Sequence, residues 1–124
     1  MLDPAKTLAT SQLTNLLECS ALFEKYGRRG VDVIASTDYR NGESTSECQS
    51  NPLWGAWTRV GSSTVYLCDK FLTTSDDQRA INIIHEALHS AGIDEYPGDP
   101  NGLSSWQINE MIAAACQLYL GGQP

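Results

Sequence analysis

The sequence predicts a small α+β protein that forms a single domain over residues 1–124. This length is sufficient for one hydrophobic core and too short for two. Apolar residues recur at three- and four-residue intervals near both ends and in the second half of the chain, which indicates amphipathic helices. Segments 53–60 and 64–68, rich in Trp, Val and Tyr, flank a Gly-Ser-Ser turn and predict a β-hairpin.

The N-terminal half is expected to hold one helix, one strand and a long loop before the hairpin. Helical periodicity covers residues 3–26, and a break near Thr10-Ser11 is left open. Residues 31–35, Val-Asp-Val-Ile-Ala, predict a short strand, and the polar residues 36–52 predict a loop. We expect the small sheet to be antiparallel.

The C-terminal half is expected to hold two helices joined by an irregular segment. Residues 74–77, Thr-Ser-Asp-Asp, supply capping oxygens and first-turn carboxylates for a helix that Gly92 ends. Residues 96–102, rich in Pro, Gly and Asp, predict irregular structure. Ser104 and Gln107 form a capping box for a last helix with one apolar stripe.

The charge of the chain excludes some classes of partner. Eight basic and fifteen acidic residues give a net charge of −7, which disfavours binding to nucleic acid or to an anionic membrane. No apolar stretch is long enough for a membrane span, and the first residues do not resemble a signal peptide. We therefore expect neither a nucleic-acid nor a membrane partner, and a monomer.

Four cysteines, at positions 19, 48, 68 and 116, include no CxxC pair. A dispersed even set of this kind favours two disulfides formed in an oxidising compartment over a structural zinc site, with buried free thiols as the alternative. We therefore expect a secreted or periplasmic mature form whose signal peptide is absent from this sequence. Three pairings are open, and we favour Cys48–Cys68, which ties the polar loop to a strand, and Cys19–Cys116, which joins the first helix to the last.

The second predicted helix carries His85-Glu86-Ala87-Leu88-His89, an HExxH motif that contains both histidines of the chain. Residues four apart on a helix lie on one face about 6 Å apart, so both imidazoles can bind one zinc ion. Glu86 lies one residue away from the ligand face, where a general base for metal-assisted hydrolysis is needed. The alternative is an ordinary amphipathic helix with two surface histidines.

The motif resembles that of the HExxH zinc metallopeptidases, the zincins. His85-Glu86-x-x-His89-x-x-Gly92-x-x-Glu95 is similar to the metzincin pattern HExxHxxGxxH/D, with Glu in the third ligand position and no Met-turn after it. Residues 65–71 are similar to the Cys-bearing strand of deuterolysin-like peptidases, whose GTxDxxYG motif is loosely matched by residues 92–98. The resemblance implies a small zincin-like domain.

A catalytic zinc ion needs a third protein ligand. We favour Glu95, because the turn at Gly92 would return its carboxylate to the metal. Glu110 is the main alternative, since Asn109-Glu110 resembles the start of the gluzincin NExxSD segment, although it lies opposite the apolar stripe of the last helix. Asp94 and Asp99 are further alternatives.

Aromatic residues are candidates for secondary roles. Tyr96, next to the expected ligand, is the first candidate to donate a hydrogen bond to the developing oxyanion, and Tyr66 and Tyr119 are alternatives. The three tryptophans are expected either to pack in the core or to line a substrate pocket. They are Trp54, Trp57 and Trp106.

Together these features predict a zinc-dependent metalloendopeptidase that hydrolyses peptide bonds through a zinc-bound water, with Zn²⁺ as cofactor and Glu86 as general base. The alternatives are a non-catalytic secreted zinc-binding or interaction module and a zinc amidase acting on a non-peptide amide. Because residues 80–124 contain no Lys or Arg, we expect a peptide or protein substrate of cationic character. The strand ending at Cys68 is expected to pair with it.

Overall fold

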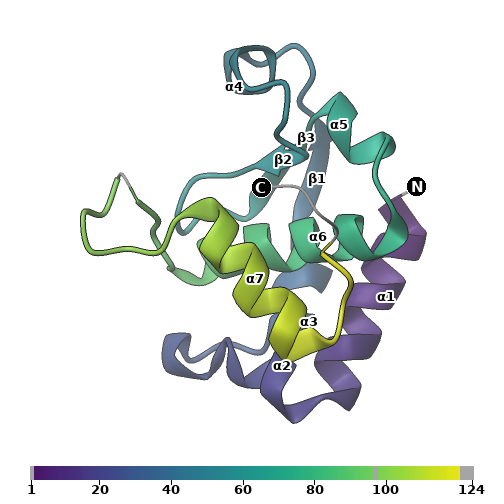
Figure 1. Ribbon diagram of the computed structural model, residues 1–124, viewed down its shortest axis with the longest axis vertical. Helices are drawn as coiled ribbons and strands as arrows, with labels where there is room; N and C mark the ends of the chain where they lie inside the picture. Colours follow the sequence, from purple (N-terminus) through teal and green to yellow (C-terminus); the bar gives the residue numbers. More distant parts are fainter. Residues whose placement is uncertain (1, 97, 121–124) are drawn as a thin grey trace.

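The computed structural model describes residues 2–96 and 98–120, and it shows the expected α+β fold. Helix α6 (Asp76–Ala91) crosses the middle of the molecule. The small sheet lies on one side of it, and helices α1 (Leu2–Asn15), α3 (Gly30–Ala35) and α7 (Ser105–Cys116) pack around its other sides (Figure 1). The helix that carries the HExxH motif is therefore the central element of the fold.

The N-terminal helical region is divided differently from the prediction. The break falls at Leu16, whose backbone is extended (φ −115°, ψ 115°), so the alternative of a break near Thr10-Ser11 is wrong. Helix α1 is followed by α2 (Leu17–Ala21) and by a 3₁₀ turn, η1 (Glu24–Tyr26). Sequence periodicity did not mark Leu16, because apolar side chains continue on both sides of it.

The strand predicted over residues 31–35 is wrong, because the segment forms helix α3. Its buried residues are Gly30, Val33 and Ile34, which have the i, i+3, i+4 spacing of one helix face. A Cβ atom on Gly30 would lie 2.8 Å from the ring of Phe23, so the helix packs closely on that ring. Burial of this face overrides the preference of the β-branched residues for a strand.

The sheet has the order β1-β3-β2 and mixed polarity. Strands β2 (Ala56–Trp57) and β3 (Thr64–Leu67) pair antiparallel, which confirms the hairpin. Strand β1 (Asp38–Asn41) pairs in parallel with β3, so the expectation of a wholly antiparallel sheet is wrong. The predicted loop over residues 36–52 contains β1 and the short helix α4 (Ser46–Ser50). Every β1 side chain is exposed or half-buried, so the strand lacks the apolar alternation that sequence reasoning needs.

Both C-terminal helices begin where the capping signals predict, and α6 ends at Gly92 as expected, but α7 ends at Cys116, so Tyr119 does not belong to its apolar stripe. Helix α6 follows the short helix α5 (Asp69–Leu72), and the hydroxyl of its N-cap, Ser75, accepts a hydrogen bond from the Gln78 amide. The capping box of α7 is complete, with Ser104 as N-cap. Among the described residues of the segment 96–102 there is no helix or strand, as predicted. Within the described part of the chain, every helix is too short or too polar to span a bilayer.

Packing fixes α6 in place. Ile81, Ile84 and Leu88 are fully buried, among the rings of Phe23 and Phe71 and the side chains of α1, α3 and α7. Burial of each such side chain contributes about 1.5–3 kcal/mol. The two histidines of this helix are therefore attached to a backbone that packing holds rigid.

Both favoured disulfides are present, Cys19–Cys116 and Cys48–Cys68. The first joins residues 97 positions apart and connects α2 to the end of α7. The second joins the α4 segment to the end of the β3 strand and spans 20 positions. Two such bridges are compatible with an oxidising, extracellular location.

Candidate metal centre

Three side chains that can ligate a metal meet beside α6. His85 and His89 lie one turn apart, and their Nε2 atoms are 3.1 Å from each other. Oε1 of Glu95 is 3.2 Å from Nε2 of His85 and 2.8 Å from Nε2 of His89. In the described part of the chain, this is the group of His, Cys, Asp and Glu side chains that could hold a metal ion.

Hydrogen bonds from the Nδ1 atoms of the two histidines fix the orientation of the rings and so of their Nε2 atoms. Nδ1 of His85 is 2.7 Å from Oδ1 of Asn109 on α7, and Nδ1 of His89 is 2.8 Å from the backbone oxygen of Ile93. Because both oxygens only accept hydrogen bonds, each Nδ1 carries the proton and donates it. In the neutral histidines, each Nε2 therefore presents a lone pair to the centre of the cluster.

This arrangement needs a cation. Two Nε2 lone pairs and one carboxylate oxygen face one another without a donor between them, so either a proton or a metal ion must balance them. Ligand bonds of about 2.0–2.1 Å in a tetrahedral zinc site give distances of about 3.3 Å between ligand atoms. Two of the observed distances, 3.1 and 3.2 Å, lie close to that value, and the third, 2.8 Å, is shorter. The donor set of two imidazoles and a carboxylate fits a zinc site with an open position.

The end of α6 brings Glu95 to the histidines. The Gly92 amide donates hydrogen bonds to the carbonyl oxygens of Leu88 and His89. Gly92 has a φ of 131°, a backbone conformation that residues with a side chain rarely adopt. The chain turns back at this residue, and the Ile93 amide also donates to the Leu88 oxygen. The turn predicted from the glycine is confirmed, and it places the carboxylate within reach of both imidazoles.

The alternative third ligands lie elsewhere. Glu110 is exposed on α7, as its position opposite the apolar stripe indicated. Asp94 lines the same cleft, but its Oδ1 accepts a hydrogen bond from the Glu95 amide. Oδ1 of Asp99 accepts from the Asn101 amide. Among the described residues, the structure brings only Glu95 together with both histidines.

Glu86 lies next to the cluster in an unusual environment. Its side chain is buried, and no hydrogen bond within the described chain holds its carboxylate. Burial raises the pKa of Glu86 to about 7, against the opposing effect of His85 and His89 and with a contribution from the charge of Glu95. A carboxyl group of this pKa can take up and release a proton near neutral pH.

The electrostatics of the metal-free cluster are those of an ion pair. Burial alone would lower the pKa of His89, but its hydrogen bond with Glu95 and the nearby charge of Glu86 raise it above 6.5. Burial would raise the pKa of Glu95, but hydrogen bonds with His85 and His89 lower it to about 2. A proton on His89 thus takes the place of a cation at this site.

The cluster opens into a cleft of about 860 Å³, lined by α6, the β2 region and the first turn of α7. All three tryptophans line it, so the expectation of a pocket role fits the structure better than that of a core role. Tyr96 is 55% exposed and does not line the cleft, and neither do Tyr66 and Tyr119. A hydrogen bond from Tyr96 to a reacting group therefore stays a prediction.

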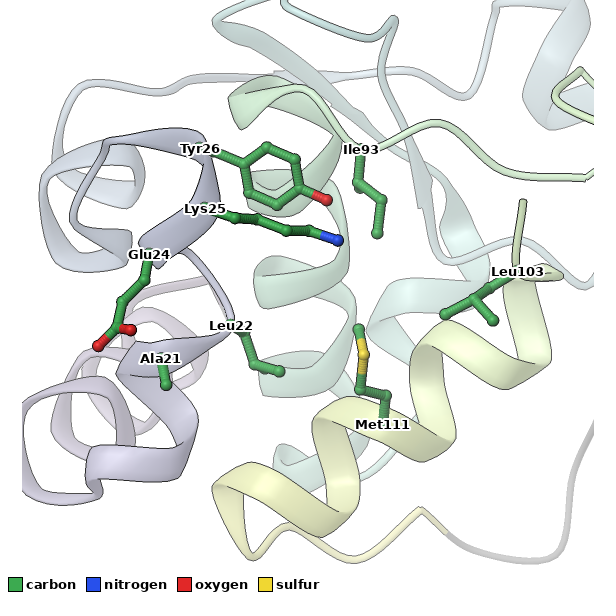
Figure 2. Close-up of a pocket in the computed structure, with 8 residues that line it drawn as sticks. All are labelled: Ala21, Leu22, Glu24, Lys25, Tyr26, Ile93, Leu103 and Met111. Atoms are coloured by element: carbon green, nitrogen blue, oxygen red, sulfur yellow. The ribbon is translucent and has the colours of Figure 1, made fainter. Parts of the chain in front are cut away.

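A second pocket, of about 550 Å³, lies between the α2–η1 region and α7 (Figure 2). Leu22, Ile93, Leu103 and Met111 converge there, with Lys25 reaching across. It contains neither histidine, so it belongs to a different part of the molecule from the metal centre.

Asn109 is the site residue that sequence reasoning missed. The Asn109-Glu110 pair is visible in the sequence, but the pattern it resembles points to the glutamate as a ligand. The asparagine has its role because α7 packs on α6, and no local pattern in the sequence indicates which α7 side chain meets His85.

The ligand set can be tested by metal analysis. We expect the wild-type protein to bind one zinc ion per chain, His85→Ala and His89→Ala to lose it, and Glu95→Ala to bind at least 10-fold more weakly. Glu110→Ala is the matched control, because its carboxylate is exposed and outside the cluster. Calorimetric titration of the metal-free proteins measures these affinities. Equal weakening by Glu95→Ala and Glu110→Ala would contradict the assignment.

Asn109 should affect the affinity without touching the metal. We expect Asn109→Ala to weaken zinc binding about 10- to 100-fold, because the His85 ring loses the acceptor that orients it. Asn109→Asp keeps an acceptor at the same position and should retain most of the affinity. The same titration compares the two variants, and an alanine variant that binds as tightly as wild type would refute the role.

The metal-free protein should become less stable as pH rises from about 5 to 8. Glu86 has a raised pKa in the folded state, so ionisation in the unfolded chain destabilises the fold progressively between pH 4.5 and about 7. His89 also has a raised pKa, so its contribution is complete below 6.5 and lost above its folded pKa. Glu95 acts in the opposite sense only below pH 4.5.

Urea unfolding of the chelator-treated protein at pH 5, 6 and 8 measures this change, which we expect to be on the order of 3 kcal/mol. Glu86→Gln, which cannot ionise, should remove most of it. A free energy of unfolding that is unchanged or rises over this range would contradict the pKa directions.

No family model matches the chain, and neither the curated proteins nor the solved structures include a match to it.

Proposed function

We propose that the protein is a secreted zinc-dependent peptidase, in which His85, His89 and Glu95 hold the metal and Glu86 is the general base. One observation carries this proposal: two Nε2 atoms and one carboxylate oxygen converge within 3.2 Å of one another at the wall of an open cleft, beside a buried carboxyl group that forms no hydrogen bond within the described chain. The two disulfides support an oxidising location for it.

The donor set supports zinc as the metal. Imidazole nitrogen and carboxylate oxygen are common zinc ligands, and three protein ligands leave a fourth position for water or substrate. A zinc ion bound there supplies Lewis acidity toward a carbonyl group and lowers the pKa of a water molecule. Side chains of the protein itself would carry out the proton transfer and orient the ligands.

Glu86 would accept the proton of the water molecule and transfer it to the leaving group. Its carboxylate takes the proton from the attacking water, and the resulting carboxylic acid then delivers it to the amine that leaves as the C–N bond breaks. In the metal-free protein, burial already raises the pKa of this carboxyl group to about 7, so its surroundings favour uptake of a proton. Asn109 and the Ile93 carbonyl keep the two imidazoles in the tautomer that ligation requires.

A non-catalytic zinc module is the main alternative. Purely structural zinc sites usually have four protein ligands and do not need a buried carboxyl group beside them. Burying Glu86 raises its pKa and so destabilises its charged form, a cost that a structural role does not explain. The open cleft and this residue together favour catalysis.

The Glu86→Gln variant separates catalysis from metal binding. We expect it to bind one zinc ion per chain as wild type does and to lose at least 100-fold of the cleavage rate, because general base catalysis contributes about 10²- to 10⁴-fold. Cleavage of unfolded casein and of a mixed peptide pool, followed by mass spectrometry, gives the rate.

Glu110→Gln is the matched control and should cleave at the wild-type rate, because Glu110 is exposed and outside the cleft. Chelation should stop cleavage, and added zinc should restore it. A zinc-loaded wild type that cleaves nothing would favour the non-catalytic module, and cleavage only of non-peptide amides would favour an amidase.

A further inference from the structure

The three tryptophans of the cleft differ in what they contact. Trp57 has partners within the protein on several sides. Its Nε1 donates a hydrogen bond to the Thr45 hydroxyl at 3.1 Å, and its ring stacks on Tyr66 with 4.6 Å between the ring centroids. The Arg59 guanidinium lies 5.5 Å from the centroid of the Trp57 ring. Its role is to build the cleft wall, because its polar atom and its ring already have partners within the protein.

Trp54 and Trp106 have no such partners. Trp54, just before β2, is 42% exposed, and Trp106 lies half-buried in the first turn of α7. Within the described chain, neither indole forms a hydrogen bond through Nε1, a stacked pair or a cation–π contact. Both line the cleft, Trp54 from the loop before β2 and Trp106 from α7, so both are available to a bound molecule.

Aliphatic side chains extend this surface. Leu53 is 77% exposed and Val60 is 48% exposed, and both line the cleft with Trp54. A single exposed leucine needs no explanation, but several large apolar side chains in one cleft mark a binding surface. Branched aliphatic groups beside an indole suit another apolar side chain.

The charges in the cleft do not select a cationic group once a divalent ion is bound. Glu47 pairs with Arg59 at 3.6 Å, so these two charges offset each other. The other acidic residues that line the cleft are Glu86, Asp94 and Glu95, and Lys70 is the other basic one. Lys70 and a divalent ion together balance these three carboxylates, which leaves the apolar surface to determine selectivity.

We propose that the cleft selects peptides with a bulky apolar side chain, phenylalanine or leucine, which packs between Trp54 and Trp106 beside Leu53. This specificity rests on the proposed peptidase function and adds the substrate class to it. It differs from the preference for cationic peptides that the charge distribution of the sequence predicts, so the two can be compared directly.

Binding to a protein that cannot turn over tests the proposal. Zinc-loaded Glu86→Gln is titrated by calorimetry with three blocked pentapeptides of glycine that carry Phe, Lys or Gly at the centre. We expect the Phe peptide to bind at least 10-fold more tightly than the other two.

Substitutions in the same background locate the selectivity. Trp54→Ala and Trp106→Ala should each remove most of the preference for Phe, whereas Tyr119→Ala, an exposed aromatic residue outside the cleft, should leave it unchanged. Leu53→Glu changes an exposed side chain without affecting the core, and it should turn the preference toward the Lys peptide. If a tryptophan variant does not fold, Leu53→Glu still tests whether this surface determines the preference.

The outcomes separate this proposal from the peptidase function. A Lys peptide that binds best, or three peptides that bind equally, would overturn the apolar specificity even if the wild type cleaves protein. Selective binding of the Phe peptide by a wild-type protein that cleaves nothing would support the apolar subsite and reject catalysis.

Discussion

The structure depends on one helix that serves the core and the site at the same time. Ile81, Ile84 and Leu88 of α6 are fully buried, and His85 and His89 lie on the same rigid backbone. A turn of helix fixes the spacing of the two imidazoles, so their Nε2 atoms face each other whether or not a cation is between them. Packing of the helix therefore supplies the energy that holds like groups together at 3.1 Å.

Hydrogen bonds from the imidazole rings of His85 and His89 connect α6 to the other segments of the site. Asn109 connects His85 to α7, and the Ile93 carbonyl connects His89 to the segment that carries Glu95. The Cys19–Cys116 disulfide holds the far end of α7, so that helix is anchored at both ends, by a covalent bond and by the site. A metal ion bound to the cluster would thus connect α6 with the segment after Gly92, and its affinity is coupled to the packing of α7.

Those parts of the site and fold that local chemistry determines were predictable from the sequence. The caps Ser75 and Ser104, the turn at Gly92 and the i, i+4 histidines are each set by a few neighbouring residues. Features set by distant packing were not. Residues 31–35 form a helix because one face of that helix packs on α1 and α6, β1 pairs with a strand far along the chain, and Asn109 meets His85 only when α7 is in place. In each case the deciding contact joins elements that the sequence pattern treats separately.

The buried carboxyl group of Glu86 lowers the stability of this fold. A side chain of similar size without a charge would avoid the desolvation that raises its pKa to about 7. Its negative charge also raises the pKa of His89, which favours a proton at the place a metal would occupy. A divalent cation in place of that proton would relieve both effects, because it would interact favourably with both carboxylates at once. Two unfavourably placed charges of the metal-free chain therefore lie around one point, and a cation bound there would stabilise the fold.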